Sequence, residues 1–148
     1  MKNFSRLFSL TTALILALVL SIPMACAAEQ ASYYFAYTDA VAYAQDAGKI
    51  LIEADVLATG TMDVIGVESI VIYEKQSDGY YDDVHTYTRY NTSGMTRTNN
   101  VEHFKSITYQ GTVGKQYFAS ITFYAKDSEG YETLSHSTNV VTAVSVAP

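Results

Sequence analysis

The side chains that could bind a metal ion or move a proton are few and lie far apart in the sequence. The chain has three histidines, His85, His103 and His136. None of them has the short spacing of a zinc motif, and none stands beside a cysteine in a ligand pattern. Exposed histidines on strands or loops are the simpler interpretation, so the sequence predicts no metal site and no cofactor.

The acidic segment SDGYYDD is a second place where ligands could meet. Asp78, Asp82 and Asp83 could offer oxygen atoms to calcium, but they lack the order of an EF-hand loop and its closing glutamate. A turn with solvated carboxylates is the preferred interpretation.

Motifs for nucleophilic catalysis are absent from the sequence. It contains neither G-x-S-x-G nor S-x-x-K, and its one cysteine, Cys26, lies in a segment that we expect to be removed. Fifteen acidic residues make some neighbouring pair inevitable, so a glycosidase pair cannot be inferred from them. We therefore expect a protein without enzymatic activity, and an extracellular hydrolase or inhibitor is the third option for its function.

Tyrosine is the residue type that most suggests binding. Four candidate ligand-binding residues cluster around a predicted hairpin and the polar loop after it: Tyr80, Tyr81, Tyr87 and Tyr90. Exposed tyrosines can stack on sugar rings or anchor a protein partner, because each has a flat apolar body with a polar tip. The alternative is that they form ordinary cross-strand pairs that stabilise the hairpin.

The elements that position these residues are predicted to be β-strands. The chain after residue 28 is rich in tyrosine, valine, isoleucine and threonine, which suit half-buried pleated surfaces. Alternating hydrophobic residues predict strands in 49–60, 68–76, 103–111 and 116–126. Asp78-Gly79 is a strong hairpin signal and predicts a returning strand in 81–90, while residues 91–100 resemble a loop. With a first strand in 32–44 and a last one in 131–144, seven strands are expected.

Seven short antiparallel strands in one domain favour an all-β fold, a single sandwich of two sheets over residues 29–148. Tyr117 begins the penultimate strand just after a glycine-containing connection. This is where sandwich domains keep a tyrosine corner, whose hydroxyl bonds back to upstream backbone. We therefore expect Tyr117 to have a structural role.

The first 28 residues have the order of a cleaved secretory signal peptide. Lys2 and Arg6 precede an apolar run that is short for a membrane span, and Pro23 and small residues follow it. An uncleaved anchor, or a lipoprotein with the lipid on Cys26, are the alternatives. After cleavage, seven basic residues remain against fifteen acidic ones, a formal charge of −8. So acidic a chain repels phosphate backbones, and nucleic-acid binding is not expected.

Two segments, ATGTMDVIGVESIVIYEK and YQGTVGKQYFASITFYAKDSEG, carry a resemblance to known proteins. With the signal peptide, they resemble small secreted bacterial proteins of uncharacterised function that have an immunoglobulin or fibronectin type III-like sandwich. The resemblance covers most of residues 47–143 and implies a fold but no functional residues. The cysteine pair and core tryptophan of true immunoglobulin domains are missing.

Our first functional hypothesis is a secreted, non-catalytic module that binds an unknown protein or polysaccharide outside the cell or at its envelope. The second is a lectin-like domain that uses Tyr80, Tyr81, Tyr87 and Tyr90. No membrane span is expected once the signal peptide has been removed.

Overall fold

The computed structural model describes residues 32–146, so the predicted signal peptide and Cys26 lie outside the described residues. The described part is all-β and antiparallel, as the sequence predicted, and its seven strands pair into one network. A short 3-10 turn, η1 (Asp46–Gly48), joins the first two strands. The strands are β1 (Phe35–Ala44), β2 (Lys49–Lys75), β3 (Tyr81–Thr88), β4 (Thr96–Gln110), β5 (Gln116–Lys126), β6 (Tyr131–Ser137) and β7 (Val141–Thr142).

β2 is one continuous strand of 27 residues. The prediction of two separate strands, over 49–60 and 68–76, was wrong. The residues between them, 61–67, contain Gly66 but no turn sequence that would reverse the chain. Met62 to Gly66 instead pair with residues 96–100 of β4, and this pairing keeps the backbone extended.

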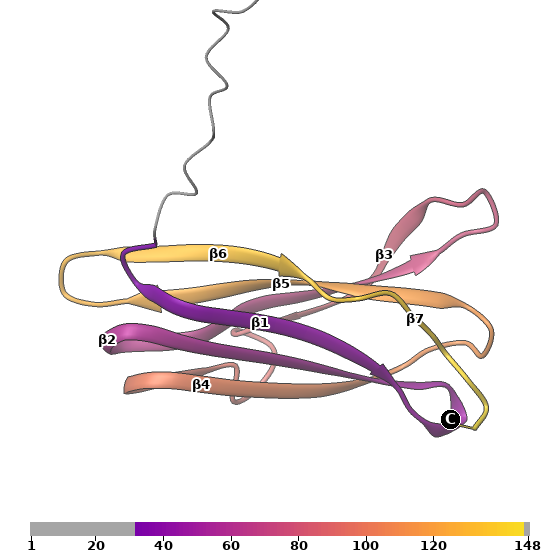
Figure 1. Ribbon diagram of the computed structural model, residues 1–148, viewed down its shortest axis with the longest axis horizontal. Coiled ribbons are helices and arrows are strands. Elements are labelled where there is room, and N and C mark those ends of the chain that lie inside the picture. Colours follow the sequence, from indigo (N-terminus) through magenta and orange to yellow (C-terminus); the bar gives the residue numbers. More distant parts are fainter. Residues whose placement is uncertain (1–31, 147–148) are drawn as a thin grey trace, which may run out of the picture. The chain divides into compact units, whose positions relative to one another are not determined.

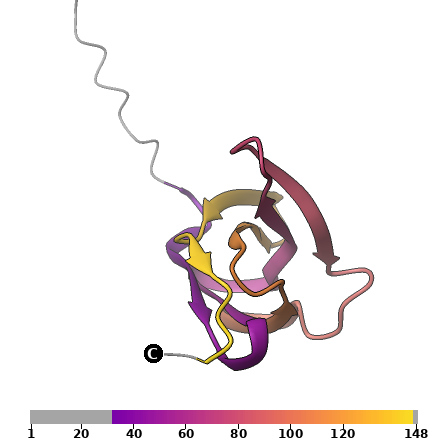
Figure 2. The ribbon, with the colours of Figure 1, turned by 90° about the vertical axis from the view of Figure 1, so that its right-hand side faces the viewer.

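The two halves of β2 have different neighbours. Residues 50–57 lie between β1 and β4, residues 64–66 between β4 and β5, and residues 69–74 between β5 and β3. β6 then pairs with β5 on its far side (Figure 1). Viewed from the end, the strands of both groups surround one interior (Figure 2). We call them the β1–β2–β4 group and the β3–β2–β5–β6 group.

One hydrophobic core joins the two groups. Ile50, Ile52 and Val56 from the first half of β2 are buried together with Ile121 and Phe123 from β5. The alternation that predicted these inward faces is confirmed in both strands. Burying these branched and aromatic side chains is the main favourable term that holds the two groups together.

A β-bulge at Glu68 changes which residues of β2 point inward. Ile65 and Val67 are buried before it, and Ile70 and Ile72 are buried after it, so the period of two slips by one residue. The extra residue, Glu68, is half-buried and turns toward Arg89.

Two further boundaries differ from the sequence prediction. Residues 96–100 belong to β4 and not to the expected loop, because they pair with residues 62–66 of β2. The expected last strand over 131–144 is divided into β6 and β7. The break falls at Asn139, whose side-chain amide pairs with both backbone groups of Ala42 in β1 at 2.9 and 3.0 Å.

The hairpin predicted at Asp78-Gly79 is present and projects beyond the other strands (Figure 1). Gly79 has a φ of 91°, which a glycine adopts without strain. The Asp78 carboxylate accepts a hydrogen bond from the Tyr80 amide at 3.0 Å and so supports the turn.

Candidate binding face

The outward face of the β3–β2–β5–β6 group carries two clusters of aromatic side chains, one toward each end. In β5, Tyr117, Ala119, Ile121, Phe123 and Ala125 point inward, as predicted. The side chains between them point outward and pair across the sheet with residues of β2 and β6. The outward set is therefore determined by the pleat.

Four side chains at one end of this face form a continuous layer, which we call the aromatic platform: Tyr90, Arg89, Tyr124 and Tyr131. The rings of Tyr124 and Tyr131 are stacked, with centroids 5.9 Å apart and planes 27° apart. The Arg89 guanidinium carbon lies 4.1 Å from the Tyr124 ring centre and 5.0 Å from that of Tyr90. Arg89 also donates a hydrogen bond to the Tyr90 hydroxyl at 2.7 Å.

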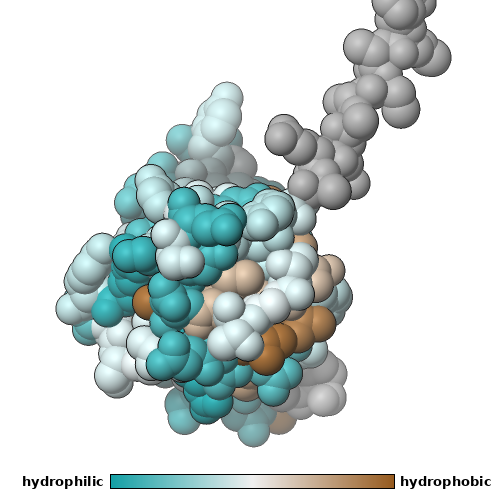
Figure 3. Space-filling model, turned by 90° about the vertical axis from the view of Figure 1, so that its left-hand side faces the viewer, coloured by the Kyte–Doolittle hydropathy of each residue, from teal (hydrophilic) through white to brown (hydrophobic). Residues whose placement is uncertain are grey.

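The two outer rings of the platform are open to solvent, while its centre is covered. Tyr90 is 80% exposed and Tyr131 is 69% exposed, whereas Tyr124 is only 8% exposed. Figure 3 shows the end of the molecule at which β5 turns into β6. That end is mostly hydrophilic or intermediate in hydropathy, with a smaller hydrophobic area at one side.

Arg89 stays charged at the centre of the platform. Burial by itself would lower its pKa, but interactions with Tyr124 and Tyr90 and the charge of Glu68 outweigh burial, so the pKa of Arg89 is raised. The guanidinium forms an ion pair with Glu68 at 3.4 Å. The platform therefore holds a cation whose charge is balanced locally.

The turn that carries Tyr131 is held by Asp127. One oxygen of its carboxylate accepts hydrogen bonds from the amides of Glu129 and Gly130 and from the Tyr34 hydroxyl, at 2.8 to 3.0 Å. These donors, the Glu129 amide first, lower the pKa of Asp127, although burial opposes them. The backbone that carries the exposed ring of Tyr131 therefore follows directly on an ordered turn.

A second aromatic group lies at the other end of the same face. Phe118 stacks on Tyr73 with centroids 4.8 Å apart and planes 7° apart, and Tyr81 meets Phe118 edge-on at 5.0 Å. All three side chains are half-buried. These rings shield one another, which fits the cross-strand pairing that the sequence analysis gave as an alternative.

The four tyrosines that the sequence analysis grouped together are separated in the structure. Tyr80 is 75% exposed in the hairpin turn, and Tyr81 packs on Phe118. Tyr87 lies against the core beside His85, and burial raises its pKa. Of the four, Tyr90 alone belongs to the aromatic platform.

Sequence reasoning missed the other three members of the platform, Arg89, Tyr124 and Tyr131. Tyr131 is 42 positions from Arg89 in the sequence and opens a different strand. One feature of the sequence could have indicated that Tyr131 is exposed. It follows the DSEG turn directly and opens its strand, so few residues of that strand can cover its side chain.

Tyr117 is 1% exposed, and its hydroxyl makes two hydrogen bonds. It accepts one from the amide of Thr112, five residues upstream, at 2.9 Å, and donates the other to the Glu74 carboxylate. Lys115 adds an ion pair to Glu74 at 3.3 Å. The Tyr117 hydroxyl, and after it Lys115, lower the pKa of Glu74 against the effect of burial.

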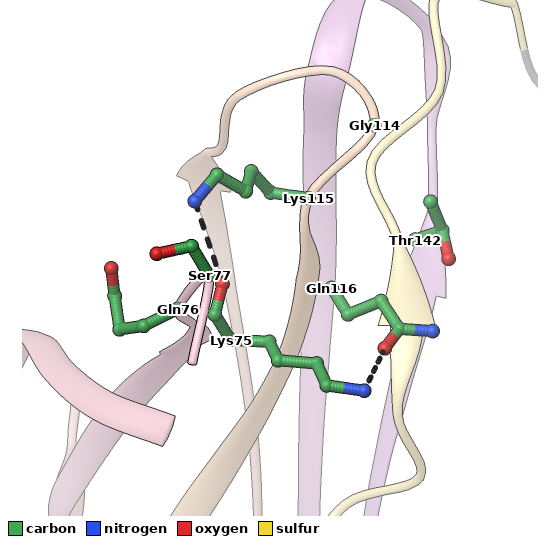
Figure 4. A pocket seen from close by; sticks show the side chains of 7 residues that line it. All are labelled: Lys75, Gln76, Ser77, Gly114, Lys115, Gln116 and Thr142. Atoms are coloured by element: carbon green, nitrogen blue, oxygen red, sulfur yellow. Dashed lines mark hydrogen bonds between the residues drawn. The ribbon is translucent and has the colours of Figure 1, made fainter. Parts of the chain in front are cut away.

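An open polar cavity of about 410 Å³ lies beside this network. Figure 4 shows the residues that line it: Lys75, Gln76, Ser77, Gly114, Lys115, Gln116 and Thr142. Lys75 donates to the Gln116 side-chain oxygen at 3.2 Å, and Lys115 donates to the backbone oxygen of Lys75 at 3.5 Å. Both ammonium groups thus have protein partners, and the cavity presents no obvious anion site.

The outward face of the β1–β2–β4 group has a different character. Asp39 and Asp55 stand directly opposite each other, which is a repulsive pair. Tyr37, 50% exposed, and Phe104, 56% exposed, share this face with them. Burial, and after it the charge of Asp39, raise the pKa of Tyr37.

The three histidines are far apart in the fold as well. Within residues 32–146, no three histidine, cysteine or acidic side chains lie close enough to hold a metal ion. His85 is exposed, and His136 lies 3.3 Å from the Thr38 hydroxyl. His103 is 4% exposed and bonds through Nε2 to the Gly94 carbonyl at 3.0 Å, while its buried Nδ1 has no partner.

His103 should make the protein less stable as the pH falls. Burial, and after it the charges of Arg97 and Lys105, lower its pKa, although the Gly94 bond and Asp55 oppose the shift. The unfolded chain takes up a proton near the ordinary histidine pKa of about 6.5, before the folded one does. We therefore expect the stability present above pH 6.5 to be lost as the pH falls toward the lower pKa of folded His103.

Urea unfolding of the wild type and of His103→Gln between pH 8 and pH 5.5 tests this. The glutamine amide can still donate to Gly94 but does not titrate, so the variant should show a flatter dependence on pH. His85→Gln is the matched control and should keep the wild-type slope. Equal slopes in all three proteins would contradict the role of His103.

Two comparisons with known proteins were made. No known protein family matches the chain, and a search of curated proteins gives no match. Among residues 32–146, no helix is long and apolar enough to cross a membrane. The class that the structure defines is therefore an all-β domain with seven antiparallel strands, and its function has to be argued from its surface.

Proposed function

We propose that this protein is a secreted, non-catalytic binding module with an immunoglobulin or fibronectin type III-like sandwich. The pairing of the strands supports the sandwich. β1, the first half of β2 and β4 would correspond to strands A, B and E. β3, the second half of β2, β5 and β6 would correspond to strands C′, C, F and G.

The bond from Thr112 to the Tyr117 hydroxyl also supports this architecture. Tyr117 would stand near the start of strand F, and its hydroxyl bonds to backbone a few residues upstream. The glutamate partner is an addition of this chain, because Glu74 comes from the end of the long β2. Secretion rests on the signal-peptide pattern of residues 1–28.

The observation that carries the binding role is the aromatic platform. Two tyrosine rings, each more than two-thirds exposed, flank a guanidinium and a ring that are packed against each other. Exposed large rings contribute little to folding, yet rigid aromatic groups are the side chains that most often dominate binding surfaces. A surface of this kind can capture a ligand without any catalytic group.

A retention experiment tests the proposal with the mature chain, residues 29–148. The wild type and a Tyr90→Ala, Tyr131→Ala double variant are incubated with insoluble polysaccharides, cell walls and culture proteins in parallel. We expect the wild type to be retained on at least one material and the double variant to be lost from it. Tyr80→Ala is the matched control, since Tyr80 is equally exposed but lies in the hairpin turn. Identical behaviour of all three proteins on every material would contradict the proposal.

A further inference from the structure

The aromatic platform has features that narrow its ligand to one chemical class, if the proposed binding function holds. The groups follow one another across the sheet, from the segment after β3, over β5, to the start of β6. Each is within 5.9 Å of the next, measured from the guanidinium carbon or the ring centroid. A ligand that touches both exposed rings must therefore extend across the strands.

The platform is ordered before any ligand arrives. Tyr124 is packed beneath Arg89, Arg89 is held by Glu68, and Asp127 fixes the turn before Tyr131. The Asn91 carboxamide accepts a hydrogen bond from the Thr88 amide at 2.7 Å and orders the segment around Tyr90. Because these contacts hold the segments that carry the two rings, less entropy is lost on binding, and even weak stacking contacts yield useful affinity.

Apart from Lys126, which stands opposite Tyr131, the groups around the platform suit an uncharged ligand that is rich in hydroxyls. Arg89 is already paired with Glu68, and the strands beside it present hydroxyl side chains, including Thr122 and Ser135, which bond to each other at 3.2 Å. Hydroxyls both donate and accept hydrogen bonds, as sugar hydroxyls do. The mature chain carries a formal charge of −8. Polyanions would therefore be repelled by the protein as a whole.

The shape of the site favours the interior of a chain over its end. Neither the 410 Å³ cavity nor a second one of 380 Å³ beside Asp46 includes any platform residue in its lining. Tyr90 and Tyr131 are each more than two-thirds exposed, so a sugar ring can lay its C–H face on the electron-rich face of a tyrosine there. An open surface of this kind does not require a free chain terminus.

We propose that the ligand is an uncharged polysaccharide whose chain crosses the aromatic platform, with sugar rings stacked on Tyr90 and Tyr131. The inference rests on the proposed binding function and adds the ligand class to it. Arg89 and Tyr124 act as positioning residues that set the separation and tilt of the two outer rings.

Affinity electrophoresis and calorimetry with the mature chain test the ligand class. The probes are soluble uncharged glucans, xylan and mannan, their oligosaccharides of increasing length, and polyanionic pectate and hyaluronan. We expect binding to at least one uncharged polysaccharide, with affinity that rises with oligosaccharide length and changes less than about twofold between low and high salt. Tyr90→Ala and Tyr131→Ala should each lower that affinity about tenfold or more, as loss of a central aromatic contact does.

Two further variants separate stacking from other effects. Tyr131→Phe keeps the ring and should retain affinity within about threefold, whereas Tyr80→Ala should behave as wild type. Both exposed rings can be truncated without opening the core, so loss of binding in a folded variant is interpretable.

The remaining outcomes overturn one proposal or both. Platform-dependent binding to polyanions alone, weakened by salt, would overturn the uncharged ligand and keep the binding function. Platform-dependent capture of a protein, with no polysaccharide bound, would do the same. Absence of any binding that depends on Tyr90 and Tyr131 would overturn both proposals.

Discussion

Replacing Gly66 with alanine is expected to lower the free energy of unfolding by about 3 kcal/mol or more. A Cβ atom at this position would lie 2.3 Å from the Met95 carbonyl oxygen and 2.7 Å from the Thr96 Cα. Both atoms are backbone, so no side chain can rotate away. The φ of 149° at Gly66 is also one that residues with a side chain rarely adopt.

The physical reason is the crowding of three strands at this point. Gly66 pairs with Thr96 of β4 and with Tyr124 of β5, where β2 passes from one strand group to the other. Val67 donates its amide to the Met95 carbonyl at 2.7 Å, which draws that oxygen toward β2. Alanine would force β2 and β4 apart, and the bond from Val67 would be strained.

Chemical denaturation of Gly66→Ala beside Gly60→Ala provides the measurement. Gly60 lies in the same strand, and a Cβ atom there meets nothing within 4 Å. The free energy of unfolding of the Gly60 variant should lie within about 0.5 kcal/mol of the wild-type value. Similar stability of the two variants would show that the approach of β4 to Gly66 is looser than described.

Removing the hydroxyl of Tyr117 should cost about 2 kcal/mol of stability, because one of its two hydrogen bonds is to a carboxylate. In Tyr117→Phe, the Thr112 amide and the Glu74 carboxylate each lose a partner at a site where the ring itself is fully covered. The phenylalanine ring should fill the same space, so the loss of stability measures the contribution of the two hydrogen bonds.

Tyr109→Phe is the control for this experiment. Its ring lies 5.8 Å from that of Tyr117 and is also partly buried, yet no hydrogen bond of its hydroxyl is seen among residues 32–146. Thermal unfolding should therefore leave Tyr109→Phe close to the wild type and shift Tyr117→Phe downward. An unchanged melting curve for Tyr117→Phe would remove its structural role.

The pH dependence of the stability of Tyr117→Phe gives a second test of the hydrogen bond between Tyr117 and Glu74. The pKa of Glu74 is lowered in the folded protein, so this carboxylate contributes stability above its unfolded pKa of about 4.3 that is lost as the pH falls. Tyr117→Phe removes the main cause of the shift. The gap between variant and wild type should therefore narrow toward pH 3.

Local pattern was enough to predict the all-β composition and the inward faces of two strands. The alternation in 49–58 and 116–126 identified the buried residues of β2 and β5, because a pleated strand exposes every second side chain to the same environment. The hairpin turn at Asp78-Gly79 could also be predicted, because few dipeptides adopt the positive φ angles that tight hairpin turns require. The hydrogen bond between the Tyr117 hydroxyl and upstream backbone could also be inferred. It depends only on the start of one strand and the connection before it.

Contacts between distant residues decided what local pattern could not. The continuity of β2 depends on the pairing of its residues 62–66 with residues 96–100. The sequence of β2 by itself does not indicate which segment it pairs with. The bulge at Glu68 arises where β2 meets β5, and it reverses which residues face the core. The platform joins Arg89 and Tyr90 to Tyr124 and Tyr131 across three strands. The sequence by itself therefore determined the strand composition and the inward faces, because these follow from neighbours one or two positions away. Only the tertiary structure decided which exposed tyrosines lie side by side, because long-range pairing and a one-residue slip set that arrangement.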